Sequence, residues 1–136
     1  MENEATTQAQ PTSPEVAAPA AETPIQPVYA TIDDFAKIEI RVGTILTVDF
    51  IEGADKLLRL TVDFGEKEPR QILSGIRMYY TPEQLIGKQC PFVVNLAPRT
   101  MKGLTSYGMI LAARTGDDKL ALFHPNIPTD VGAHVG

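Results

Sequence analysis

Apolar and polar side chains alternate along two stretches of this chain, and that alternation constrains its fold more than any other feature. Apolar residues occupy even positions between residues 38 and 50, and again between residues 58 and 64. These residues are Ile38, Ile40, Val42, Leu46, Val48, Phe50, Leu58, Leu60, Val62 and Phe64. A period of two residues is typical of a strand with one buried face. We therefore expect two strands whose even-numbered side chains point into a core.

Glycine and proline divide the next part of the chain. Turns are expected at residues 52–55 and 65–69, and a third, short strand runs from Arg70 to Ser74. Gly43 interrupts the first strand. It indicates a bulge or sharp bend, as a strand needs when it serves both sides of a small barrel. A short capped turn is predicted over residues 32–36, with Thr31 as its cap.

One compact helix is predicted after the third strand. Thr81 is its N-cap, Pro82 its first helical residue, Gln84 completes a capping box, and Gly87 ends it. After this helix, the pattern of apolar and turn residues again predicts strands.

Apolar runs at residues 92–94 and 109–113 are interpreted as buried strands, and a last strand is expected over residues 120–123. A lone helix between the third and fourth strands of an all-β domain is the layout of the OB-fold, a five-stranded Greek-key barrel. The predicted fold is therefore an all-β OB-fold barrel with one short helix, preceded by a disordered N-terminal tail.

The charge of the chain is distributed unevenly. Its net charge is −5, but residues 1–33 hold five of the 17 acidic residues and none of the 12 basic ones. The remainder therefore carries 12 residues of each sign. Residues 1–33, rich in Ala and Pro, are predicted to be a disordered tail or linker, and residues 34–136 the folded domain. A neutral domain still permits a basic face for a polyanion.

The stretch from Asn95 to Ala113 holds the candidate functional site. It is a long loop between two expected core strands, and it is too long for a tight hairpin. Arg99 and Lys102 give it positive charge beside Pro98 and Gly103. A loop fixed at both ends by core strands is a good place to hold a polyanion.

Signals for catalysis and cofactors are weak. Leu104 stands where a nucleophile-elbow motif around Ser106 would need glycine. His124 and His134 have no other ligand at metal spacing, and no phosphate-cradling glycine loop occurs. We expect no cofactor and no catalytic residue. The single Cys90 fits a reducing compartment such as the cytoplasm, and no apolar run approaches the length of a membrane helix.

Several short motifs resemble, in the same order, the tRNA-binding domain family found at the C-terminus of bacterial methionyl-tRNA synthetases and in free-standing structure-specific tRNA-binding proteins. They are Asp34 to Gly43, Ala54 to Leu57, Ser74 to Ile76, Asn95 to Arg99 and Ser106 to Met109. The resemblance covers essentially all of the predicted domain. It implies an OB-fold that binds tRNA by shape and phosphate contacts and assists aminoacylation without catalysing it.

The resemblance also implies partners and site residues. The partners would be tRNA, a second copy in a homodimer, and an aminoacyl-tRNA synthetase catalytic chain. Segment 123–135 is too rich in proline for a regular strand, yet it keeps apolar residues that need a surface to cover, as does the turn around Ile32 and Phe35. These two segments are expected to form the dimer interface; the alternative is that they fold back on their own barrel and leave a monomer. The tRNA-binding residues would be Lys56, Asn95, Arg99, Lys102, Ser106 and Met109.

Simpler interpretations stand beside these. Lys56 could be a solvated turn lysine, Asn95 could organise its own loop, and Met109 could pack in the core. Tyr79 and Tyr80 are more typical of half-buried anchors than of base-stacking residues. For the whole chain, the alternatives are a chaperone-like polypeptide-binding dimer of the same fold family and a purely structural dimerisation module.

Overall fold

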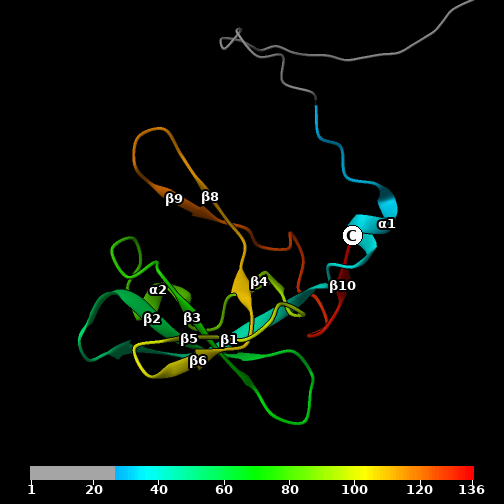
Figure 1. Cartoon of the computed structure of the whole chain (residues 1–136). Coiled ribbons are helices and arrows are strands. Elements are labelled where there is room, and N and C mark those ends of the chain that lie inside the picture. Colours follow the sequence, from blue (N-terminus) through cyan, green and yellow to red (C-terminus); the bar gives the residue numbers. More distant parts are fainter. Residues whose placement is uncertain (1–26) are drawn as a thin grey trace, which may run out of the picture. The chain divides into compact units, whose positions relative to one another are not determined.

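The computed structural model describes residues 27–136 and divides the chain into two units at residue 31 (Figure 1). Most of the predicted tail, residues 1–33, lies outside the described residues, so the tail stays a prediction. No helix between residues 27 and 136 has the length and apolar character needed to cross a membrane.

The second unit is almost entirely β-structure, which confirms the predicted fold class. Its central sheet has the strand order β3-β2-β1-β4-β7, and β10 pairs with β1. Short hairpins β5–β6 and β8–β9 make up the rest (Figure 1). The elements are α1 (Ile32–Ala36), β1 (Ile40–Ile51), β2 (Ala54–Asp63), β3 (Arg70–Ser74), α2 (Pro82–Leu85), β4 (Gln89–Val93), β5 (Arg99–Met101), β6 (Leu104–Ser106), β7 (Met109–Ile110), β8 (Ala112–Arg114), β9 (Leu120–Leu122) and β10 (His134–Val135).

Besides pairing with β10, the strand β1 pairs with β4 and β2 along successive parts of its length, as Gly43 indicated. Its first part, Ile40 to Thr44, pairs with β4, and its second part, Thr44 to Ile51, pairs with β2. A β-carbon on Gly43 would lie 2.5 Å from Val62 Cγ1, so only glycine allows β2 to cross this closely. The bulge itself lies further along, at Leu46, where the pairing register with β2 shifts.

The predicted side-chain alternation is wrong for part of β1. Ile45, at an odd position just before the bulge, is fully buried, and Leu46 and Phe50 are exposed, at 41% and 58%, whereas the even-numbered Val48 is buried as predicted. One extra residue in a strand reverses the alternation between the residues on its two sides, so Ile45 and Val48 both point into the core across the bulge. In β2 no such shift occurs, and the predicted core residues Leu58, Leu60, Val62 and Phe64 are all buried.

The sheet closes into a barrel through hydrogen bonds between β3 and the segment that leads into β7. The Tyr107 amide donates to the Gln71 carbonyl (2.9 Å), and the Leu73 amide donates to Ser106 Oγ (3.0 Å). The Gln71 side chain donates in turn to the Thr105 carbonyl (2.8 Å). The barrel encloses a core that contains Ile45, Leu58, Leu60, Ile72 and Phe92.

The helix α2 lies between β3 and β4, as predicted, and its cap has the expected geometry. The Thr81 amide donates to Gln84 Oε1 (2.8 Å), and Pro82 is the first helical residue. Leu85 is the buried residue of this helix and belongs to the barrel core. Gly87 follows with a φ of 84°, a conformation that glycine adopts without strain.

One expectation about the last third of the chain is wrong. Residues 109–113 do not form one buried strand, because pairing breaks at Leu111, and Ala112 and Ala113 are exposed in the β8–β9 hairpin. Residues 123–133, which include the prolines, form no strand, as expected. Only the two residues of β10 then pair with β1 within the same chain.

Candidate nucleic-acid interface

The loop between β4 and β7 is too long to be a tight hairpin, as expected, but it contains a hairpin of its own. Its strands β5 and β6 are joined by Lys102 and Gly103, whose φ angles are 52° and 79°. Two consecutive residues with positive φ define a type I′ turn, the connection that best matches the twist of a two-residue hairpin. The turn places Lys102 at the tip.

A small apolar cluster holds this hairpin against the barrel. Met101 and Leu104, which pair across the hairpin, pack on Ile51, Ala54 and Leu73. These three residues come from the end of β1, the start of β2 and β3. The hairpin is therefore docked where the β1–β2 turn projects, rather than hanging free in solvent.

Docking brings two of the predicted site residues together. Lys56 and Lys102 line one open cleft of about 280 Å³. Apart from Lys102, the lining is the segment from Gly53 to Leu57, in which Asp55 is the carboxylate. No carboxylate of residues 27–136 forms an ion pair with either lysine. The cleft therefore presents two ammonium groups against a single acid.

Three further site residues share a second, smaller cavity of about 70 Å³ on the same hairpin. It is lined by Arg99, Ser106 and Met109 together with Leu73, Leu96, Ala97, Met101 and Gly108. Arg99 is exposed and Met109 is 45% exposed, so Met109 is not a core residue. Ser106 is buried, accepts from the Leu73 amide and donates to the Gly108 carbonyl (3.1 Å). Its hydroxyl thus fixes the end of the hairpin, and a contact between Ser106 and RNA stays a prediction.

Asn95 lies apart from both cavities. Its Oδ1 accepts from the Glu39 amide (2.8 Å), and its Nδ2 donates to the Lys37 carbonyl (2.6 Å). Both ends of the amide are used to tie the start of the loop to the residues before β1, as the loop-organising interpretation requires. An RNA contact by Asn95 remains a prediction.

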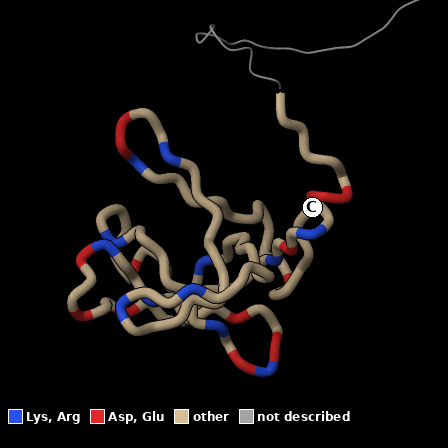
Figure 2. Tube along the Cα trace, viewed as in Figure 1, with Lys and Arg blue, Asp and Glu red and all other residues tan. Residues whose placement is uncertain are grey.

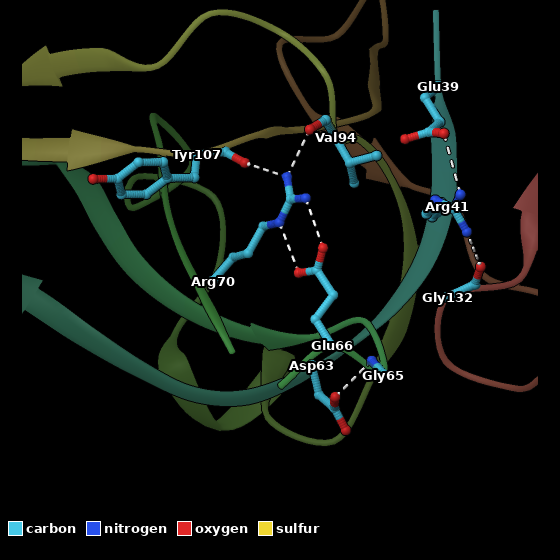
Figure 3. A network of polar contacts seen from close by, with 9 residues as sticks. All are labelled: Glu39, Arg41, Asp63, Gly65, Glu66, Arg70, Val94, Tyr107 and Gly132. Atoms are coloured by element: carbon cyan, nitrogen blue, oxygen red, sulfur yellow. Dashed lines mark hydrogen bonds and ion pairs between the residues drawn. The ribbon is translucent and has the colours of Figure 1, made fainter. Parts of the chain in front are cut away.

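Arg70, which is not among the residues predicted from the sequence, organises the loop. Its guanidinium donates to the Val94 carbonyl (2.6 Å) and the Tyr107 carbonyl (3.0 Å), which lie at the two ends of the loop (Figure 3). It also forms a bidentate pair with Glu66, at 2.9 and 2.8 Å. The hydrogen bond from Arg70 holds the pKa of Glu66 below its ordinary value. Arg70 therefore acts as a clasp that closes the base of the loop.

Most other cations of the described chain are paired with acids. Arg59 lies 3.5 Å from Asp49, Arg114 lies 3.8 Å from Asp118, and Lys119 lies 3.4 Å from Asp117. Figure 2 shows basic and acidic residues following one another along most turns. Arg99 and Lys102 of the β5–β6 hairpin have no such partner within residues 27–136, a property that they share with Lys56, Lys67, Arg77 and Lys88.

The thiol and histidine side chains do not form a reactive site. Cys90 is buried in β4 with Sγ 3.6 Å from His124 Nδ1, and burial raises the pKa of the thiol to about 11. A thiol with that pKa stays protonated at neutral pH and is a poor nucleophile. Among residues 27–136, no group of three His, Cys, Asp or Glu side chains is placed to hold a metal ion.

A closed small barrel with a docked, cationic loop defines an OB-fold module of the kind that binds nucleic acid. Residues 40–134 match the family described as "Putative tRNA binding domain". The match covers more than half of the chain, so the chain belongs to this tRNA-binding domain family.

Within that family, the chain is similar to part of methionine–tRNA ligases. It is 52% identical over 113 residues to the enzyme of Cupriavidus metallidurans, a match that covers 77% of this chain and 16% of the relative. The chain thus spans about a sixth of the length of such curated relatives.

Two solved structures are similar to this chain in both fold and sequence. A MetRS-related protein from Pyrococcus horikoshii is 39% identical, with a TM-score of 0.75 over 82% of this chain and all of that one. The chaperone CsaA from Bacillus anthracis is 29% identical, with a TM-score of 0.72 over 80% of this chain and all of that one.

Proposed function

We propose that this chain is a non-catalytic module that binds tRNA through the β5–β6 hairpin and the adjoining β1–β2 turn. The observation that carries the proposal is the meeting of Lys56 and Lys102 at one cleft, with Arg99 at the second cavity of the same hairpin and no ion-pair partner for any of the three in the described chain. Cations free of carboxylates are available to neutralise phosphates, and phosphate contacts supply most of the affinity of such complexes.

Recognition would depend on the shape of the RNA. Phosphates and 2′-hydroxyls of a folded RNA are presented in a fixed arrangement, which a rigid protein surface reads without distinguishing bases. The docked hairpin supplies such rigidity, because its apolar residues and the Arg70 clasp hold it from both ends. Asn95, Ser106 and Met109 would position this surface or contact the RNA at its edge.

The partners of the module are part of the proposal. A homodimer would present two copies of the hairpin to one tRNA. An aminoacyl-tRNA synthetase in the cytoplasm would carry out the chemistry, since the module assists aminoacylation only by raising the local concentration of tRNA. The similarity to a segment of methionine–tRNA ligase supports that assignment.

A gel-shift titration with unfractionated tRNA at several salt concentrations tests the function. Wild-type binding should weaken with salt by about 0.7 to 0.9 log units per log unit of salt for each phosphate contact. A triple variant, Lys56→Ala, Arg99→Ala and Lys102→Ala, should bind weakly and with a slope lower by about two to three units.

The matched control removes the same charge elsewhere. Lys37→Ala, Lys67→Ala and Lys119→Ala change residues 37, 67 and 119, which lie outside both cavities of the hairpin. This control should keep the wild-type slope. Equal losses in the two triple variants would mean that only overall charge matters, and the assigned interface would be wrong.

A second candidate function is the binding of unfolded polypeptide, favoured by the structural similarity to the chaperone CsaA. An open groove of about 600 Å³ lined by His124 and residues 125–128, which include Pro125, Ile127 and Pro128, is the apolar surface that this function would use. Addition of an unfolded protein to the gel shift separates the two. If unfolded protein competes with tRNA, and if the triple cation variant binds unfolded protein as strongly as wild type does, polypeptide binding would be favoured.

A further inference from the structure

Phe50 is a large aromatic residue that the barrel does not bury. Its side chain is 58% exposed, and it belongs to neither of the two apolar clusters of the described domain. It lies near the end of β1, two residues after the buried Val48 and beside a second shift in the pairing register with β2. An exposed phenyl ring does not contribute the free energy that its burial would provide, so its position on the surface indicates a role in binding.

Arg77 covers this ring. The guanidinium carbon lies 4.4 Å from the centre of the Phe50 ring, within the range of a cation–π contact. Arg77 Nη1 donates to the Ala54 carbonyl (3.0 Å), which fixes the guanidinium over the ring. No ion pair joins Arg77 to a carboxylate of residues 27–136. A flat cation and a flat ring are thus held together at the surface, with the charge not neutralised.

This pair is continuous with the proposed phosphate-binding cleft. Ala54, which accepts the hydrogen bond from Arg77, also lines the cleft of Lys56 and Lys102. The amide of Arg77 donates to the Lys56 carbonyl (3.3 Å), so the two basic residues are neighbours across the backbone. A nucleotide whose phosphate contacts Lys56 would therefore have its sugar and base near Phe50 and Arg77.

We propose that Phe50 and Arg77 form a stacking platform for an unpaired base of the bound RNA. Aromatic rings and arginine guanidinium groups both stack on bases, and only bases outside a double helix offer a free face. Double-stranded RNA would meet the lysines without using the platform. The inference rests on the proposed tRNA binding, and adds that the module prefers RNA with a single-stranded segment.

The experiment measures the affinity of Phe50→Leu for three probes: unfractionated tRNA, a uridine oligonucleotide, and a blunt RNA duplex. Loss of a base–aromatic stack weakens binding about 5- to 150-fold. That loss is expected for tRNA and the oligonucleotide, with no change for the duplex. Phe50→Tyr keeps a ring and should keep the affinity, while Leu46→Ala removes another exposed apolar side chain of β1 and serves as the matched control.

A spectroscopic readout is independent of affinity. The chain has four tyrosines but no tryptophan, so Phe50→Trp places a single tryptophan, which can be excited selectively, at the platform. Stacking of a base should quench its fluorescence on addition of tRNA or oligonucleotide but not of duplex. Wild-type affinity of Phe50→Leu for tRNA, or equal losses on all three probes, would overturn the platform while leaving tRNA binding in place. A wild-type chain that binds no tRNA would instead remove the proposed function.

Discussion

Arg70 occupies a position from which one side chain holds both ends of the candidate interface. Four of its hydrogen bonds reach Glu66, Val94 and Tyr107, and its guanidinium also lies 5.6 Å from the centre of the Phe64 ring. Planar, bidentate geometry is specific to arginine, so lysine could not replace these contacts. Glu66 in turn keeps the guanidinium oriented toward the two carbonyl groups.

A first prediction concerns Glu66→Gln. The folded-state pKa of Glu66 is lowered, first through its hydrogen bond with Arg70, so its charge stabilises the fold above its ordinary value of 4.5 and this stability is lost as the pH falls through the lowered pKa. The variant should be less stable than wild type at pH 7, by at most about 1 kcal/mol because the pair is partly exposed. Urea denaturation at pH 7 and pH 3 checks this. The difference should shrink at pH 3, and one that grew in acid would contradict the assignment.

At the same scale, the RNA contacts predicted for Lys56, Arg99 and Lys102 stay predictions. All three side chains are exposed, as a phosphate contact requires. Ser106 and Asn95 are instead engaged with backbone groups more than 30 residues away, as their bonds to Leu73 and Lys37 show. A local pattern carries no information about such distant partners, and Arg70 was missed for the same reason.

The β5–β6 hairpin is the element on which the proposed function depends. Its type I′ turn requires positive φ at Lys102 and Gly103, and lysine is not a residue that favours this conformation. The turn therefore stabilises the fold less than the best available sequence would, while it places an ammonium group at the tip. That combination supports the proposal that Lys102 serves RNA binding through its charge.

The second prediction follows for Lys102→Asn. Asparagine is among the preferred residues of a type I′ turn, so the variant should be as stable as wild type or slightly more so. It should nevertheless lower the salt slope of tRNA binding by about 0.7 to 0.9 units, since one phosphate contact is lost. Thermal unfolding and the salt titration are measured on the same preparation. Lys67→Asn is the control, and an unchanged slope in Lys102→Asn would remove Lys102 from the interface.

Elements whose signals are local were predicted well, and those that depend on the closure of the barrel were not. The cap of α2 and the bounds of β3 follow from nearby residues and are confirmed. The bulge at Leu46 arises because β1 must turn from β4 to β2, and the β5–β6 hairpin forms because Met101 and Leu104 find a surface on β1, β2 and β3. Neither surface exists until the barrel has closed.

At the scale of the whole molecule, the third prediction is that the domain does not need residues 1–30. A chain starting at Thr31 should keep the thermal midpoint of the full chain, because the closed barrel and both apolar clusters are formed by later residues. Four acidic residues are removed with residues 1–30. Affinity for tRNA should therefore stay the same or rise slightly at low salt. A truncated chain that failed to fold would contradict the proposed boundary near residue 33.

The fourth prediction concerns the proposed homodimer. Phe123 and Ile127, at 49% and 65% exposure, and Ile32, at 77%, form apolar surface that the described domain leaves open. Sedimentation equilibrium at micromolar concentration should give twice the chain mass of 14.8 kDa. Ile127→Ser should shift the protein to monomer, while the control Leu46→Ser should not. A wild-type protein that sediments as a single species of one chain would refute the dimer.

The pairing of β10 with β1 brings the two ends of the domain together. A β-carbon on Gly136 would lie 3.3 Å from the ring of Phe35, one turn after the start of α1 (Figure 1). A domain whose two ends lie close together can be inserted into a loop of a host protein without distorting that loop. It can also be rejoined in a new order, with fresh ends at the tip between β8 and β9. The domain is therefore suited to insertion at any site where a host protein has two neighbouring backbone positions.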